Sequence, residues 1–150
     1  MDPIILNAIH LVMPKPTWND KLSNSKPPEI KRLEKPFAGM PDGGIMLIAS
    51  PEIIDAYVRA IPRGHTVTVK AMRGELADRH RAEFTCPVTT GIFLRVVAEA
   101  AWEKHLSGEP IDSITPFWRV IEPEAPLANK LVCGPNFISE QRQKEKPSSR

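Results

Sequence analysis

The sequence predicts a mainly α-helical domain with a small amount of β-structure, built as a winged helix-turn-helix that follows an extended, proline-rich N-terminal arm. Two observations predict the helix pair, because apolar residues recur at helical spacing over 68–79 and again, for longer, over 89–102. A third predicts the wing, since 117–121 and Leu131-Val132 have the composition of short strands flanking a turn-rich segment. We therefore expect an arm over 1–44, a winged-helix domain over 45–142 and a disordered tail over 143–150.

Length and composition limit the chain to one hydrophobic core, since it has 150 residues of which 41% are apolar. Its 20 Lys and Arg residues exceed its 18 Asp and Glu residues by only two, a balance that permits nucleic-acid binding without arguing for it. The two cysteines, Cys86 and Cys133, are far apart and fit neither a disulfide framework nor a four-cysteine zinc site. We expect no cofactor and no metal.

Membrane insertion and export are not expected. No apolar run approaches the roughly 18 residues of a membrane span, and the N-terminal stretch Met1–Leu6 lacks the basic region of a signal peptide. With two unpaired cysteines, these features predict a soluble cytoplasmic protein.

Prolines and glycines interrupt the segment 13–44, which predicts an extended arm that is more mobile than the rest of the chain. The prolines and glycines are Pro14, Pro16, Pro27, Pro28, Pro36, Pro41, Gly39, Gly43 and Gly44. An alternative is that Trp18, Leu22 and Phe37 dock individually on the domain. The arm is also a candidate contact for a protein partner.

The domain begins with the apolar run 45–49, which predicts a buried strand. Ser50 and Pro51 then provide an N-cap and a first helical residue, and Pro62 with Gly64 ends the helix. The stretch Thr66-Val67-Thr68 is expected to begin the next helix, and Thr89 or Thr90 to cap the long one after it.

The stretch Thr115-Pro116-Phe117-Trp118-Arg119-Val120 resembles the Pro-Cys-His-Arg-Val motif of alkylguanine-DNA alkyltransferases, in which the cysteine accepts the alkyl group. Ile61-Pro62-Arg63-Gly64 is similar to the Ile-Pro-x-Gly before the first helix of that family's DNA-binding half. The resemblance covers about 53–142. The block 85–95 also resembles a group of uncharacterised bacterial proteins filed under the same methyltransferase name.

Phe117 stands at the position of the acceptor cysteine and Trp118 at that of the histidine, so the resemblance implies no alkyl transfer. It is greater to the alkyltransferase-like proteins, which lack the cysteine and recognise damaged bases in DNA repair without chemistry. Val69 stands where the family has the tyrosine that helps to turn a nucleotide out of the duplex, and Arg95 is the nearest match to its intercalating arginine.

These considerations give a set of candidate residues for binding double-stranded DNA. Phe117 and Trp118 would form an aromatic wall on which a base stacks, or would pack in the core. The candidates for contacts to the DNA are Thr68, Lys70, Arg73, Thr89, Thr90, Arg95 and Arg119. For Arg119 the alternative is a structural role in the wing, and for Lys70 and Arg73 a solvated helix face.

Two other functions compete with DNA binding. The fold could serve as a protein-interaction module that has no DNA surface. Alternatively, Cys86 precedes Pro87 at a helix N-terminus with Arg79, His80 and Arg81 nearby, an environment that favours a reactive thiolate and hence a thiol-dependent enzyme.

Overall fold

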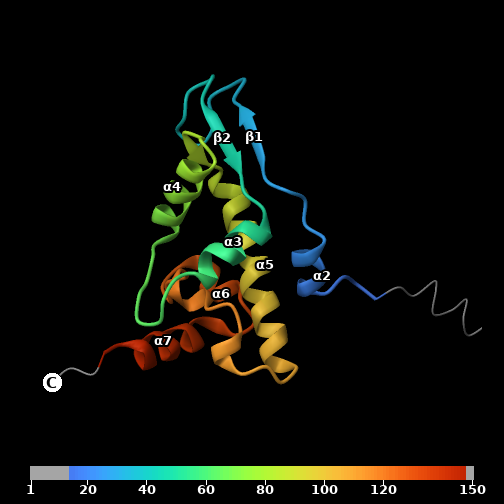
Figure 1. The fold of residues 1–150 in the computed structure, drawn as a ribbon, viewed down its shortest axis with the longest axis vertical. Coiled ribbons are helices and arrows are strands. Elements are labelled where there is room, and N and C mark those ends of the chain that lie inside the picture. Colours follow the sequence, from blue (N-terminus) through green and yellow to red (C-terminus); the bar gives the residue numbers. More distant parts are fainter. Residues whose placement is uncertain (1–13, 148–150) are drawn as a thin grey trace, which may run out of the picture.

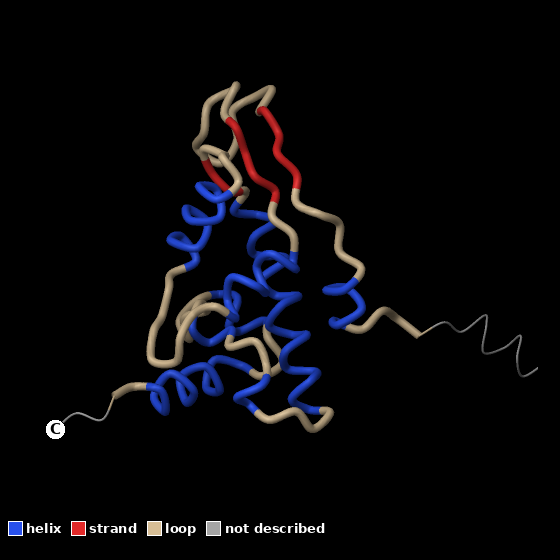
Figure 2. The backbone as a smooth tube through the Cα atoms, in the orientation of Figure 1, coloured by secondary structure: helices blue, strands red, loops and turns tan. Residues whose placement is uncertain are grey.

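The computed structural model describes residues 14–147, so the expectation for Met1–Leu6 lies outside the described chain. The fold is mainly helical with one small sheet at one end (Figures 1 and 2). In chain order the elements are α2 (Trp18–Ser23), β1 (Glu29–Arg32), β2 (Ile45–Ile48), α3 (Pro51–Arg59), α4 (Val69–Arg79), β3 (Phe84–Thr85), α5 (Pro87–Leu106), α6 (Pro126–Lys130) and α7 (Gly134–Glu145), with 3-10 turns at Ile111–Ser113 and Phe117–Arg119.

The predicted strand over 45–49 is confirmed as β2, the central strand of the sheet. β1 pairs with it in antiparallel orientation and the two-residue β3 in parallel orientation. Leu47 is fully buried, because α4 and β3 lie against the strand.

The helix starts predicted at Ser50 and within 66–68 are confirmed by the capping hydrogen bonds of Ser50 and Thr68. The Ser50 hydroxyl accepts the N–H of Ile53 at 3.2 Å, and the Thr68 hydroxyl accepts the N–H of Ala71 at 3.0 Å. After α3 the chain turns at Gly64, whose φ of +85° lies in the region that glycine adopts without strain.

The long helix α5 begins earlier than predicted, and neither Thr89 nor Thr90 caps it. Cys86 is the N-cap residue and makes no side-chain capping bond, while Pro87 occupies the first helical position. Thr90 is a full turn inside the helix and donates its hydroxyl to the Cys86 carbonyl at 2.6 Å. A Pro at the first position, rather than a hydroxyl, therefore sets the start of this helix.

The predicted two-strand wing is wrong for the described chain. Phe117–Arg119 forms a buried 3-10 turn, in which the Arg119 N–H donates to Pro116 and the Val120 N–H to Phe117. Leu131-Val132 joins α6 to α7 and is not a strand. In a half-exposed strand, successive side chains alternate between a buried and an exposed face. Phe117 and Trp118 are adjacent and both buried, so this alternation is missing.

The segment predicted as an extended arm contains α2 and β1, and both pack on the rest of the chain. α2 lies against α5, and β1 completes the sheet. Trp18 and Leu22 are half-buried, as the docking alternative expected, whereas Phe37 is exposed. Antiparallel pairing with β2 gives the backbone of this proline-rich segment partners that composition alone does not reveal.

α7 extends into the segment predicted as a disordered tail. The helix ends at Glu145, whose carboxylate is buried and paired with Arg119. Residues 143–145 therefore belong to the fold. Residues 148–150 of that predicted tail lie outside the described chain.

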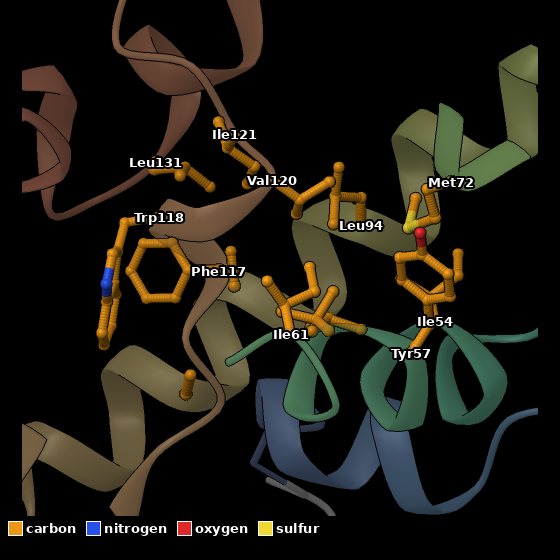
Figure 3. Close-up of a cluster of buried hydrophobic side chains, with 14 of the residues drawn as sticks. Ile54, Tyr57, Ile61, Met72, Leu94, Phe117, Trp118, Val120, Ile121 and Leu131 are labelled. Carbon is orange, nitrogen blue, oxygen red and sulfur yellow. The ribbon is translucent and has the colours of Figure 1, made fainter. Parts of the chain in front are cut away.

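One hydrophobic core joins the helices, as Figure 3 shows for its central side chains. Ile54, Met72 and Leu94 come from α3, α4 and α5, and Phe117 and Trp118 enter from the 3-10 turn. Within 14–147, no helix is both long enough and apolar enough to cross a membrane.

The Glu103 carboxylate holds the start of α2 on α5. It accepts the N–H groups of Trp18 and Asn19 at 3.0 Å each and the Asn19 side-chain amide at 2.8 Å. Burial acts to raise the pKa of Glu103, but these bonds outweigh it and the pKa is lowered. The charged carboxylate is therefore the form that docks the helix.

We predict that Glu103→Ala releases α2, because all three of these bonds depend on its carboxylate. Trypsin should then cleave after Lys21 about tenfold faster than in the unchanged protein, since cleavage requires local opening. Glu109→Ala, which removes an exposed acid just beyond the same helix, is the matched control. An unchanged cleavage rate in Glu103→Ala would show that apolar packing alone holds the segment.

Candidate nucleic-acid interface

Phe117 and Trp118 do not form the expected open wall for a base. Their exposed fractions are 0% and 1%, and their rings meet edge to face with centroids 5.4 Å apart. Phe137 of α7 stacks on Phe117 at 5.9 Å. The Trp118 indole N–H donates to Glu145 at 2.9 Å. The chain itself thus covers the aromatic faces, and the core alternative is the one observed (Figure 3).

Arg119 makes the contacts expected of the structural alternative, and they engage its guanidinium within the chain. Its guanidinium donates twice to the Glu145 carboxylate, at 2.9 Å each, and once to the Ile61 carbonyl at 2.7 Å. Burial would raise the pKa of Glu145, yet the hydrogen bonds from Arg119 and Trp118 lower it overall. The pair therefore ties α7 to the 3-10 turn and to the end of α3.

The cavity beside this motif is not a promising anion site. It measures about 540 Å³ and is lined by Arg59, Arg63, Asp112 and Arg119, among others. Arg59 pairs with Asp55 at 3.0 Å, and Arg63 lies 3.8 Å from Glu145. The lining of this cavity also includes an acid, Asp112, and its most buried cation, Arg119, is held by Glu145.

The α4 candidates lie next to the start of α5. The Thr85 hydroxyl donates to the Arg73 carbonyl at 2.7 Å, which holds α4 against the residues that lead into α5. Lys70 is exposed and Arg73 is half-buried. Thr68 is exposed but its hydroxyl caps α4. Besides Lys70 and Arg73, the helix carries the exposed charged residues Glu75, Asp78 and Arg79.

The exposed face of α5 is not the face that carries Thr89 and Thr90, the two residues proposed to contact DNA. Thr90 is fully buried, and Thr89 is half-buried with an enclosed hydroxyl. The exposed positions are Val88 and Ile92, at 58% and 57%, and a side chain at Gly91 would meet nothing within 4 Å. These positions and Arg95 follow helical spacing, so the first half of α5 presents one narrow, mostly apolar stripe.

A groove of about 500 Å³ opens over this stripe between α2 and α6. Its described lining contains three cations, Lys21, Arg95 and Lys130, and no carboxylate. The other lining residues are Trp18, Val88, Gly91, Ile92, Val96 and Leu127. A cationic rim around an apolar floor suits a ligand that is both anionic and flat-faced.

Trp18 and Arg95 are fixed in this groove by their neighbours. Lys21 Nζ lies 4.4 Å and the Arg95 guanidinium carbon 5.3 Å from the Trp18 ring centroid. Arg95 also donates to the Lys130 carbonyl at 3.2 Å and lies 3.7 Å from the Glu99 carboxylate. The guanidinium of Arg95 therefore contacts both sides of the groove, α2 through Trp18 and α6 through Lys130.

Glu99 lies beneath Arg95 and is almost completely buried. Burial raises its pKa, against the opposing effects of the Val132 N–H, which it accepts at 3.2 Å, and of Arg95. This carboxylate positions the guanidinium from the core side. It is not among the residues that line the groove.

Sequence reasoning found Arg95 but missed Trp18, Lys21 and Lys130. Trp18 and Lys21 lie more than 65 residues before α5, in a segment expected to be an extended arm. Lys130 follows a turn-rich stretch assigned to the wing. The four-residue spacing of Val88, Ile92 and Val96 was available in the sequence, but an apolar stripe is usually assigned to the core.

The two cysteines offer no accessible thiolate. Cys86 is buried with 4% of its surface exposed. Burial, with the nearby Glu99 carboxylate, raises the pKa of the Cys133 thiol to about 11. Across 14–147, no cluster of three or more His, Cys, Asp or Glu side chains has the arrangement of a metal site.

Comparisons with known proteins give no match: no family model fits the chain, and no curated protein or solved structure is significantly similar to it. The resemblance to alkyltransferases therefore rests on the sequence motifs alone.

Proposed function

We propose that this protein binds double-stranded DNA without catalysis, through the groove over the first half of α5. The observation that carries the proposal is the lining of this groove, where Lys21, Arg95 and Lys130 surround an apolar stripe and no described lining residue is acidic. Lys70 and Arg73, the candidates on α4, are not among the residues that line this groove.

The charges suit a phosphate backbone. Phosphate contacts supply most of non-specific DNA affinity, and lysine and arginine make them. The small net charge of +2 is no obstacle, because Lys21, Arg95 and Lys130 line one groove without an acid in its lining, although Glu99 beneath it pairs with Arg95. Local charge, not the total, sets the field that a duplex meets.

Alkyl transfer is not part of the proposal. The reaction needs a thiolate beside a base that accepts its proton. Phe117 has neither group and is fully buried, and Cys86 is buried at the start of α5. Recognition of a damaged base is also left out, because the aromatic faces assigned to it are covered by the chain.

We predict salt-dependent binding of a fluorescent 20-base-pair duplex that weakens in Lys21→Ala combined with Lys130→Ala. Affinity should fall roughly tenfold or more, because charge-assisted phosphate contacts are lost. The slope of log affinity against log salt should shrink by about 0.9 for each contact removed. Fluorescence anisotropy at several salt concentrations measures both quantities.

The control is Lys35→Ala combined with Lys144→Ala, which changes the net charge equally at two exposed lysines outside the groove. This variant should keep most of the affinity. Equal loss in both double variants would mean that total charge, not the groove, controls binding.

A protein-interaction module is the second candidate, and the exposure of Val88 and Ile92 favours it. A partner helix could place apolar side chains on this stripe. Absence of duplex binding at low salt would favour this candidate over the first.

A further inference from the structure

The free edge of the sheet provides a separate inference. Ile45 and Leu47 use their carbonyls to accept bonds from Glu83 and Cys86 on the β3 side. β2 therefore pairs with β1 through Met46 and Ile48, which lie opposite Lys31 and Glu29. Because bonding alternates along an antiparallel strand, the backbone groups of Ile30 and Arg32 point to the open edge.

Nothing among residues 14–147 forms a backbone bond with this edge. All four β1 residues are exposed, including Ile30 at 50%. Such an edge is a template for another strand unless charges oppose the pairing. In β1 the charges of Glu29, Lys31 and Arg32 determine which strand can pair with this edge.

We propose that the partner is a second copy of this chain, paired through β1 in antiparallel orientation about a two-fold axis at Ile30. Residues that lie opposite each other must both bond outward or both bond inward. Among the strand residues, a two-fold axis can therefore pass through any of the four, Glu29, Ile30, Lys31 or Arg32. Axes at Glu29, Lys31 or Arg32 place like charges opposite each other.

An axis at Ile30 places Glu29 opposite Lys31 of the second copy, twice by symmetry. It also brings the two exposed Ile30 side chains together on the other face of the sheet. Within one chain, Lys31 Nζ already lies 3.8 Å from Glu29 Oε2, so both side chains occupy the face on which the new pairs form. Opposite charges across strands stabilise a pair, whereas like charges destabilise it.

Pro28 fits the same register. It lies opposite Arg32 of the second copy, where its carbonyl accepts a bond and its missing N–H is not needed for that contact. The paired edge thus has four backbone hydrogen bonds, two between the Ile30 residues and two from Arg32 to Pro28.

The experiment is sedimentation equilibrium of the full chain over a range of concentrations, with charge reversals at the edge. The unchanged protein should approach twice the chain mass of 16.7 kDa. Glu29→Lys and Lys31→Glu should each weaken the dimer by about tenfold, because each places two like-charged pairs across the axis. Their combination restores unlike pairs and should recover the dimer.

Glu140→Lys, which reverses an exposed charge on α7, outside the sheet, is the control and should leave the dimer unchanged. Far-UV circular dichroism verifies that each variant keeps its helices. A monomer at all concentrations would overturn the proposal. So would a dimer that is insensitive to the single reversals, or a double reversal that stays as weak as either single one.

Discussion

Replacing Arg119 by alanine should destabilise the fold by about 3–5 kcal/mol, the usual cost of removing one partner from a buried ion pair. The side chains of Arg119 and Glu145 are 14% and 6% exposed, so the remaining carboxylate would stay buried without its cation. The Ile61 carbonyl would also lose its donor. A loss of this size is a large part of a typical 5–15 kcal/mol stability.

Urea unfolding followed by circular dichroism measures this change. Arg63→Ala is the matched control, because Arg63 lies 3.8 Å from the same carboxylate but is 61% exposed, and its loss should change stability by less than about 1 kcal/mol. Similar losses in both variants would show that the buried pair has no special role.

The same pair gives the fold an acid-sensitive contact. Because the pKa of Glu145 is lower in the folded state, its contribution is present above the unfolded pKa and is lost as the pH falls through the folded value. Arg119→Ala should therefore lose less stability on acidification than the unchanged protein.

Replacing Phe117 by alanine should cost about 3–5 kcal/mol, because it leaves a cavity at the centre of the core. The ring is fully buried and contacts Trp118 and Phe137, which belong to the 3-10 turn and to α7. Loss of these contacts should loosen α7 as well as the turn. Thermal unfolding measures the change.

Phe37→Ala is the matched control, since that ring is 40% exposed in the hairpin beyond β1. Its loss should be within about 0.5 kcal/mol. If Phe117→Ala were equally mild, the ring would be dispensable to packing, and an open, base-accepting arrangement at this position would regain support.

Local signals predicted much of the fold correctly. Ser50 was identified as a cap from its hydroxyl and the residues that follow, and a helix start was expected within 66–68; the structure confirms the first and places the second cap at Thr68. The apolar run at Leu47 predicted the central strand, and it is confirmed as β2. These features depend on a few adjacent residues, which is why a single sequence reveals them.

Features that depend on distant residues were missed. β1 is a strand because β2 supplies its hydrogen-bond partners, and α2 docks because Glu103, more than 80 residues away, accepts its N–H groups. The run at Phe117 looks like a strand by composition, yet burial of both Phe117 and Trp118 requires a tight turn.

The residues of the candidate site also fall into those that the sequence suggested and those that only the fold brings together. Lys70 and Arg73 were chosen for their charge on one helix, and Lys70 remains exposed. Arg119 was also chosen for its charge, but only the fold reveals that its guanidinium is hydrogen-bonded to the Glu145 carboxylate. Lys21 and Lys130 reach one groove from opposite ends of the chain, a juxtaposition that no local pattern encodes.

Lysine footprinting tests the central claim, duplex binding at the α5 groove, most directly. The protein is acetylated with and without duplex DNA at low salt, and the modification of each lysine is measured by mass spectrometry. We predict that DNA protects Lys21 and Lys130, while Lys35 and Lys144 are modified equally in both samples. Protection of Lys144 with Lys21 and Lys130 unchanged, or no protection at any lysine, would contradict the account.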